Sequence, residues 1–306
     1  MEYTAYKFRF LTGVHFGEGR LETGAFVFGA DRLFSALATE TLAQGKDAFD
    51  NLVDLVQSGK IRFSDAFPFA GNNYFLQRPL LRILRKNTEE TIAKRKVLKK
   101  LEYLPMTKLS AYLEGRAEPE KLLPPKFGDF TVKTSVAINP DEDPKPYRVG
   151  VFSFKEDRGL YVILGYESKK DASFIEDFLD RLSFVGIGGK RSSGLGRFEL
   201  HFGQMPPEGM KRLTGEYQTY MTLCSALPND EELALAMEGA NYLLEKKSGF
   251  VASPNYAPEW RRKRDVYAFK VGSCFRKKFE GQLRDVSSGG KHPVYRYLMP
   301  LFMGVE

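Results

Sequence analysis

Alternating apolar and polar positions at the start of the chain predict a β-strand over residues 3–10. A glycine-rich turn follows, and apolar residues then recur at helical spacing over residues 31–41. We expect Asp31 to be the N-cap of this helix, because a carboxylate accepts hydrogen bonds from free backbone amides. Gly45 is expected to end it.

The rest of the N-terminal half predicts a sheet with a second helix. Strands are expected at 61–69, 74–80, 147–154, 159–166 and 197–202, and an amphipathic helix at 171–183. With a block of about 82–146 set aside, the order is strand, helix, strands, helix, strand. That is the split βαβ order of a ferredoxin-like (RRM-like) domain.

The block of about 82–146 differs in composition from its surroundings. Residues 82–108 predict a basic helix with sparse apolar positions, and a proline-rich segment continues from there to about 146. We therefore expect this block to be a basic insertion in the first domain.

The second half begins after Met-Pro-Pro-Glu-Gly at 205–209, which predicts a linker. Its expected elements are a strand at 216–227, a helix at 230–244, and strands at 248–252, 266–275 and 294–304. This order begins like that of a ferredoxin-like unit, although no second helix is visible. The sequence thus predicts an α+β fold of two RRM-like domains, with the insertion in the first, over residues 1–204 and 205–306.

Positive charge is concentrated in two segments. The chain has a net charge of +7, yet residues 82–108 alone hold nine basic and three acidic residues, and residues 261–278 hold eight basic and one acidic. The rest of the chain is therefore net negative. Local positive charge on an otherwise acidic protein favours a polyanionic partner. The alternative is two solvated surface segments.

Composition excludes several classes of protein. Two cysteines and three histidines are too few for a disulfide framework or a Cys/His zinc site, so we expect neither metal nor cofactor. No apolar run approaches the roughly 18 residues of a membrane helix, and the charged, alternating N-terminus is unlike a signal peptide. We expect a soluble protein of the cytoplasm.

A glycine-rich loop at 185–198 carries the strongest chemical signal. Glycines surround Lys190 and Arg191, and Ser192 and Ser193 add hydroxyl donors. Glycine permits positive φ and a close backbone approach, and exposed amides can form an anion nest. The loop lacks the order of a Walker A motif, and it leads from a helix into a strand, unlike a dinucleotide fingerprint. Phosphate or an RNA backbone is the expected ligand; the alternative is a connector with two solvated cations.

Five ordered motifs resemble one family of CRISPR proteins. They are H-F-G-E-G from residue 15, A-D-R-L-F-S-A-L at 30–37, D-A-F-P-F at 65–69, G-G-K-R-S-S-G-L-G-R-F-E-L at 188–200 and H-P-V-Y-R-Y-L-M-P-L-F at 292–302. The glycine loop is similar to that of the RAMP superfamily. The whole set resembles the fourth subunits of type III-A (Csm) effector complexes and covers nearly the whole chain.

The resemblance implies a non-catalytic assembly subunit. Such a protein grips the 5′ handle of the guide RNA (crRNA), docks the large polymerase-like subunit at the base of the complex and contacts the adjacent backbone RAMP subunit. By the resemblance, cleavage of target RNA and DNA belongs to other subunits, and no membrane is involved. A pure scaffold, whose basic segments meet acidic proteins, is a rival.

A second rival is a metal-independent RAMP endoribonuclease with His15 as general base. Such an enzyme needs a base, an acid and a group that stabilises the phosphorane. Arg20 or the loop cations could stabilise charge, but no paired acid is evident, since His201 lies in a predicted strand and His292 is far along the chain. RNA contact or a structural role are the other readings of His15.

The densest cationic run is W-R-R-K-R at 260–264, where Trp260 could stack on a base. A solvated or protein-facing loop is the alternative. We take Asp31 and Asp65 as structural. The candidate RNA-binding residues are His15, Phe16, Gly17, Arg20, Gly186, Gly188, Gly189, Lys190, Arg191, Ser192, Ser193, Gly194, Gly196, Arg261, Arg262, Lys263 and Arg264.

Overall fold

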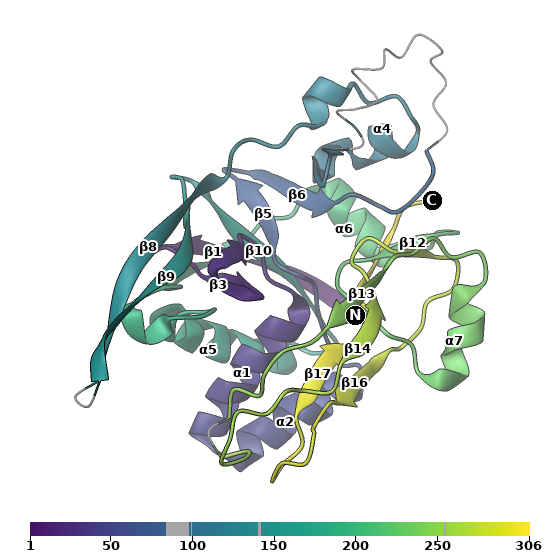
Figure 1. The fold of residues 1–306 in the computed structure, drawn as a ribbon. Coiled ribbons are helices and arrows are strands. Elements are labelled where there is room, and N and C mark those ends of the chain that lie inside the picture. Colours follow the sequence, from purple (N-terminus) through teal and green to yellow (C-terminus); the bar gives the residue numbers. More distant parts are fainter. Residues whose placement is uncertain (84–97, 99, 140–141, 254) are drawn as a thin grey trace.

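The centre of the computed structural model is a seven-stranded antiparallel sheet (Figure 1). The structure describes residues 1–83, 98, 100–139, 142–253 and 255–306. Along the sheet the order is β11-β1-β10-β5-β6-β7, and β4 also pairs with β10. The strands are β1 (Glu2–Phe10), β4 (Ile61–Phe63), β5 (Phe67–Ala70), β6 (Asn73–Gln77), β7 (Tyr103–Pro105), β10 (Arg158–Tyr166) and β11 (Phe198–Gly203).

Three helices cover one face of this sheet: α1 (Ala30–Gln44), α2 (Lys46–Gln57) and α5 (Lys169–Val185). The alternation in β1 places Tyr6 and Phe8 on this face, where they meet Leu33 of α1 and Phe178 of α5 in one buried cluster. The periodicity that predicted α1, α5 and β1 is therefore the pattern of a core.

The opposite face of the sheet is also buried. Tyr161 and Ile163 of β10 pack in a second cluster with Met221 and Leu301 from the C-terminal half. The cover includes two short 3₁₀ helices at Met106–Lys108 and Pro119–Leu122, α4 (Leu109–Leu113) and α6 (Pro207–Thr214). An RRM stacks bases on its open sheet face; here that face is closed, so any RNA must use loops and clefts.

The described part of the C-terminal half, residues 205–253 and 255–306, is built from short strands and two helices, α6 and α7 (Asp230–Met237). A three-stranded sheet has the order β15-β12-β18, and two-stranded sheets form from β13-β14 and β16-β17. Their bounds are β12 (Tyr220–Thr222), β13 (Leu244–Lys247), β14 (Val266–Phe269), β15 (Cys274–Phe275), β16 (Gln282–Asp285), β17 (Tyr295–Leu298) and β18 (Phe302–Gly304).

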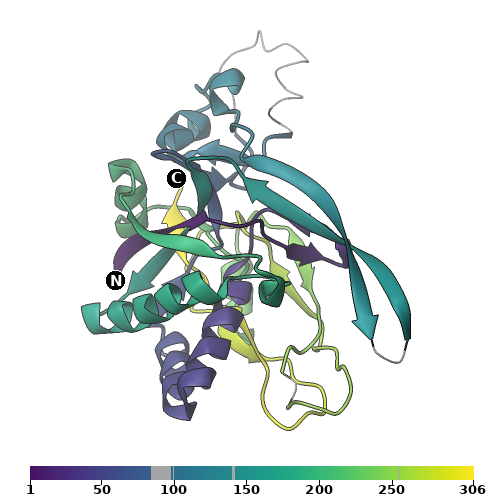
Figure 2. The same ribbon diagram turned by 90° about the vertical axis from the view of Figure 1, so that its left-hand side faces the viewer.

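Two hairpins extend from the body. The short one joins β2 (Phe16–Glu18) to β3 (Arg20–Ala25), and the long one joins β8 (Gly128–Asn139) to β9 (Glu142–Phe154). The long hairpin projects well beyond the sheet in both views (Figures 1 and 2). Its base is held by paired backbone hydrogen bonds between Val14 and Phe152, of 2.8 and 2.9 Å.

Several predicted boundaries in the N-terminal half are wrong. Asp31 is not the N-cap of α1: Gly29 occupies that position, and Asp65 Oδ1 accepts the hydrogen bond from the Ala30 amide at 2.8 Å. A second helix, α2, directly follows Gly45. The strand expected at 147–154 is real, but it pairs with β8 in the projecting hairpin and not with the central sheet.

The predicted basic helix lies mostly outside the described residues, at 84–97 and 99. The described residues Leu98 and Lys100 are helical, but the helix does not reach 108 as expected, because β7 and a 3₁₀ turn occupy 103–108. Further along, the expected linker at 205–209 runs into α6, which starts at Pro207. The helix expected to reach 244 ends at Met237, just before Gly239 at φ +64°.

The structure is a mixed α and β fold built on antiparallel sheets. The finer interpretation, two ferredoxin-like units divided near residue 204, stays a prediction.

Candidate nucleic-acid interface

The glycine-rich loop packs against the turn that follows β1. The Gly189 amide donates to the His15 carbonyl at 2.8 Å, and the Gly196 amide donates to the Gly13 carbonyl at 2.9 Å. The Leu11 amide bonds the Arg197 carbonyl at 2.9 Å. Two segments far apart in sequence, 11–20 and 186–197, thus form one continuous surface.

Most glycines in this loop are required by its own packing. A Cβ on Gly188, at φ +104°, would lie 2.8 Å from the His15 carbonyl oxygen, and one on Gly196, at φ +83°, would lie 2.2 Å from the Ile187 oxygen. Gly186 and Gly189 are similarly confined, by Leu195 and by His15. Gly194, at φ +81°, has open space around it. The glycines mainly fold the loop onto its neighbours, and Gly194 leaves room for a ligand.

The loop cations face two different elements. Lys190 adopts the left-handed conformation, and its Nζ lies 4.4 Å from the centre of the Tyr147 ring on β9. Arg191 directs a guanidinium nitrogen to Glu40 of α1 at 3.4 Å. Ser192 and Ser193 form a 3₁₀ turn with Arg191 and are exposed, as is Gly194. The tip therefore offers hydroxyls, amides and a cation beside the long hairpin.

His15 has a structural partner. Its side chain is 6% exposed, and Nδ1 lies 2.7 Å from the Gly150 carbonyl oxygen, so the ring N–H donates to β9. His201 instead pairs with Glu199 on β11, and His292 bonds the Ser253 hydroxyl. Since neither of these other histidines contacts His15, the geometry brings together no histidine acid–base pair.

The side chain of Phe16, a candidate RNA-binding residue, is not accessible to RNA. Its side chain is fully buried and packs against Phe28 at 5.1 Å between ring centres, because the alternation of β2 turns it into the core. Gly17, the next residue, is exposed, and its carbonyl accepts a hydrogen bond from Arg32 at 3.2 Å. Arg20 is exposed and lines a cavity of about 570 Å³ together with Tyr147 of the long hairpin.

The cationic run at 261–264 is divided among several environments. Lys263 turns toward a central cleft, whereas Arg264 donates to the Asp285 carbonyl at 3.1 Å. Arg262 lies 4.0 Å from Asp265, and Arg261 is exposed. Trp260 is 82% exposed. Only part of the run is thus free for a polyanion.

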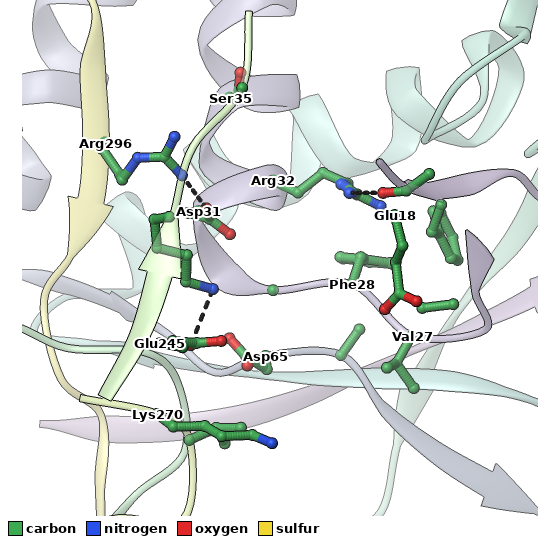
Figure 3. Close-up of a pocket in the computed structure, with 18 of the residues that line it drawn as sticks. Glu18, Val27, Phe28, Asp31, Arg32, Ser35, Asp65, Glu245, Lys270 and Arg296 are labelled. Atoms are coloured by element: carbon green, nitrogen blue, oxygen red, sulfur yellow. Dashed lines mark hydrogen bonds and ion pairs between the residues drawn. The ribbon is translucent and has the colours of Figure 1, made fainter. Parts of the chain in front are cut away.

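The central cleft is the feature that sequence reasoning missed. It has a volume of about 710 Å³ and lies between the start of α1, the short hairpin, β13 and β17 (Figure 3). Basic residues from widely separated segments line it, and acidic residues lie among them. Of its cations, Lys263 and Lys270 lie in the cationic segment 261–278, but nothing in the sequence indicates that the others converge with them. Its cations are Arg32, Lys246, Lys247, Lys263, Lys270 and Arg296.

Ion pairs organise the wall of this cleft. Arg296 donates to Asp31 at 2.8 Å, and Lys247 lies 3.1 Å from Glu245 (Figure 3). Burial favours the neutral form of Asp31, but the nearby cations, Lys247 and Arg296 first, outweigh it and hold its pKa below the usual value. Burial, chiefly, raises the pKa of Asp65 to about 7.

The charge of Lys263 on this wall is only partly compensated. Burial and then the neighbouring Arg296 lower its pKa, which Asp31 only partly offsets. A phosphate placed in the cleft would relieve this repulsion, because it supplies the opposite charge.

Comparison with known proteins identifies the family. The family model of the RAMP superfamily matches residues 7–199, and that of the CRISPR Csm4 C-terminal domain matches residues 215–305. The chain is 38% identical over 294 residues to the CRISPR system Cms protein Csm4 of Mycobacterium tuberculosis, covering 95% of this chain and 94% of that relative. It is 37% identical over 313 residues to the Csm4 protein of Streptococcus thermophilus, covering 98% and 99%.

Solved structures agree in fold. A chain of the Csm3–Csm4 subcomplex of the type III-A CRISPR-Cas interference complex matches with a TM-score of 0.69 at 16% identity, over 100% of both chains. A chain of the Csm1–Csm4 cassette in complex with cA4 matches with a TM-score of 0.63 at 21% identity, over 99% and 98%. The sheet and loops thus define a RAMP-superfamily protein. Within that superfamily, the chain belongs to the Csm4 family of CRISPR systems, which confirms the resemblance seen in the sequence.

The described residues form neither a membrane-spanning helix nor a cluster of metal ligands. Among the described residues, no helix is long and apolar enough to cross a membrane. Within the same ranges, no group of three or more histidine, cysteine or acidic side chains is arranged to hold a metal ion.

Proposed function

We propose that this protein is the guide-RNA-binding and assembly subunit of a type III-A (Csm) CRISPR-Cas complex. It captures the 5′ handle of the crRNA, docks the large polymerase-like subunit at the base of the complex and contacts the adjacent backbone RAMP subunit in the cytoplasm. It does so without catalysis, from two RRM-like units. Family membership and the partners named in the solved relatives support this role.

The main support for an RNA-binding role is that the glycine loop, the short hairpin and the central cleft form one continuous polar surface. The glycine loop is bonded to residues 13–15, and the short hairpin that follows them borders the central cleft through Gly17 and Glu18. A single strand can therefore run from Lys190 along the hairpin toward the cleft cations. Because the sheet face is covered, this path is the binding mode that the fold leaves open.

Removing the two loop cations is expected to weaken guide binding without unfolding the protein. Each charge-assisted contact with phosphate contributes about 1.5–3 kcal/mol, so Lys190→Ala with Arg191→Ala should lower affinity for handle RNA by at least about tenfold. Arg191 contributes less, since Glu40 already pairs with it. The measurement is RNA binding by fluorescence anisotropy, together with guide content of the purified complex.

The matched control is Lys169→Ala with Lys170→Ala, which removes the same charge from the exposed first turn of α5, at the far end of that helix. The control should bind handle RNA nearly as the wild type does. Equal loss in both variants would show that only net charge matters and would contradict a binding role for the loop.

The endoribonuclease alternative predicts a different result. Because His15 is buried and donates to Gly150, we expect the purified protein to leave single-stranded repeat RNA uncut, with or without divalent metal. Specific cleavage that disappears in His15→Ala but persists in His201→Ala would establish the enzyme instead. Product analysis on denaturing gels distinguishes these outcomes.

A further inference from the structure

The outer strand of the central sheet, β11, has an open edge. It pairs with β1 on one side, and the strand pairings of the described chain place nothing on the other. An edge strand presents unpaired backbone amides and carbonyls that can pair with another strand. The short helix α6, which follows β11, packs against β18 and the 3₁₀ turn at Met106–Lys108, and no further backbone hydrogen bond within the described chain engages β11, so the edge can accept an additional strand.

A small cavity of about 290 Å³ lies beside this edge. Tyr6 and Phe202, directly opposite each other on β1 and β11, form one side, with ring centres 5.4 Å apart. Glu176, Asp177 and Asp180 of α5 form the other. Phe202 is 68% exposed, and Tyr6 is its aromatic partner among the described residues.

The Tyr6 hydroxyl lacks a hydrogen-bond partner within the described chain. The residue is only 2% exposed, and it lines the cavity. Burial and then Glu176 raise the pKa of Tyr6, so the hydroxyl stays protonated. The hydroxyl oxygen keeps some exposure to this cavity, so a ligand there can reach it. Its oxygen can therefore accept a hydrogen bond from a donor that enters the cavity.

The three carboxylates form no ion pair with any described residue. Burial, followed by the charges of Asp177 and Asp180, raises the pKa of Glu176. His201 also lines the cavity but pairs with Glu199. A phosphate backbone would be repelled by this cluster, whereas a cationic side chain would be attracted.

We propose that the β11 edge is a docking site for an extended segment of a protein partner that carries an arginine or lysine. The segment adds a strand to β11, and its cationic side chain enters the cavity, donates to the Tyr6 hydroxyl and faces the α5 carboxylates. The Phe202 ring packs on the stem and charge of that side chain. The proposed function supplies the candidate partners, the large and backbone subunits, but the site itself is separate from the RNA surface.

The test is a reconstituted complex of this protein with guide RNA and both partner subunits. Charge reversal by Asp177→Lys with Asp180→Lys changes two exposed positions, so the protein should still fold. We expect affinity for one partner subunit to fall by roughly tenfold or more, with handle RNA binding undiminished. The control is Asp47→Lys with Asp54→Lys, the same charge change on exposed positions of α2, which should leave assembly intact.

A cross-linking readout locates the occupant. With p-benzoylphenylalanine in place of Phe202, the assembled complex should yield a cross-link to a partner peptide that carries arginine or lysine close to the linked residue. Cross-links only to RNA, only to a second copy of this chain, or to nothing would overturn the proposal, as would unchanged partner affinity after charge reversal. Failure to bind guide RNA or any subunit in the wild type would instead refute the proposed function.

Discussion

Replacing Asp31 with alanine is expected to lower the free energy of unfolding by about 3 kcal/mol at neutral pH. The reason is the buried cation that it pairs with: Arg296 is 7% exposed, its Nε has no partner among the described residues, and its pair with Asp31 joins segments 265 positions apart. Removal of one partner of a buried ion pair typically costs about 3–5 kcal/mol. We take the lower end, since Asp31 keeps 17% of its side chain exposed.

This effect should depend on pH in a defined direction. Because the folded state holds the pKa of Asp31 below 3.8, the carboxylate stabilises the protein above that value and loses its contribution as the pH falls through the folded pKa. The difference between wild type and variant should therefore shrink toward acid. Urea unfolding at pH 7 and in acid measures it.

The control for Asp31 is Asp47→Ala. Asp47 also lies in the first turn of its helix, α2, but it is exposed, so the substitution should cost less than about 1 kcal/mol. An equally small cost for Asp31→Ala would mean that the ion pair between Asp31 and Arg296 contributes little to the free energy of unfolding.

Gly188→Val in the glycine loop is expected to be strongly destabilising. A side chain at φ +104° is strained, and its Cβ would meet the His15 carbonyl at 2.8 Å and the Phe16 ring at 3.0 Å. Backbone strain alone costs about 1–3 kcal/mol, and the clash adds to it. We expect a loss of about 3 kcal/mol or more in unfolding free energy, together with displacement of the loop from the turn at 13–16.

Gly194→Ala separates strain from contact. This glycine has a similar left-handed backbone, at φ +81°, but nothing lies within 4 Å of the added Cβ. The loss in free energy of unfolding should stay at about 1–2 kcal/mol, the usual cost of a left-handed conformation for a residue other than glycine. Equal destabilisation by both substitutions in chemical denaturation would refute the contact with His15 as the cause.

Long, periodic elements were predictable from sequence, and short ones were not. The amphipathic stripes of α1 and α5 and the alternation of β1 report directly on a shared core. In the C-terminal half, strands of two to four residues carry too few positions for a period to show. The expected strand at 294–304 became β17 and β18, interrupted at Pro300, because proline cannot donate to a ladder.

The sequence pointed to the part of the candidate site that lies in one contiguous segment. It did not point to the part that is assembled from several separate segments. The loop at 186–196 is local, so its residues stood out together. The cleft instead joins Arg32, Lys247, Lys263 and Arg296, whose convergence depends on tertiary packing. Tertiary packing also buries Phe16, which was expected to contact RNA. The surrounding fold decides whether a side chain is buried, and a short sequence motif does not.

The closed second face of the sheet has a consequence for cooperativity. Tyr161 and Ile163 share one core with Leu223 and Leu301, so neither half keeps its apolar surface covered without the other. The two halves should therefore lose structure in a single transition, and separate expression of residues 1–204 would leave that surface in water. A ligand that spans the cleft would raise the melting temperature of both halves together, by mass action on one folding equilibrium.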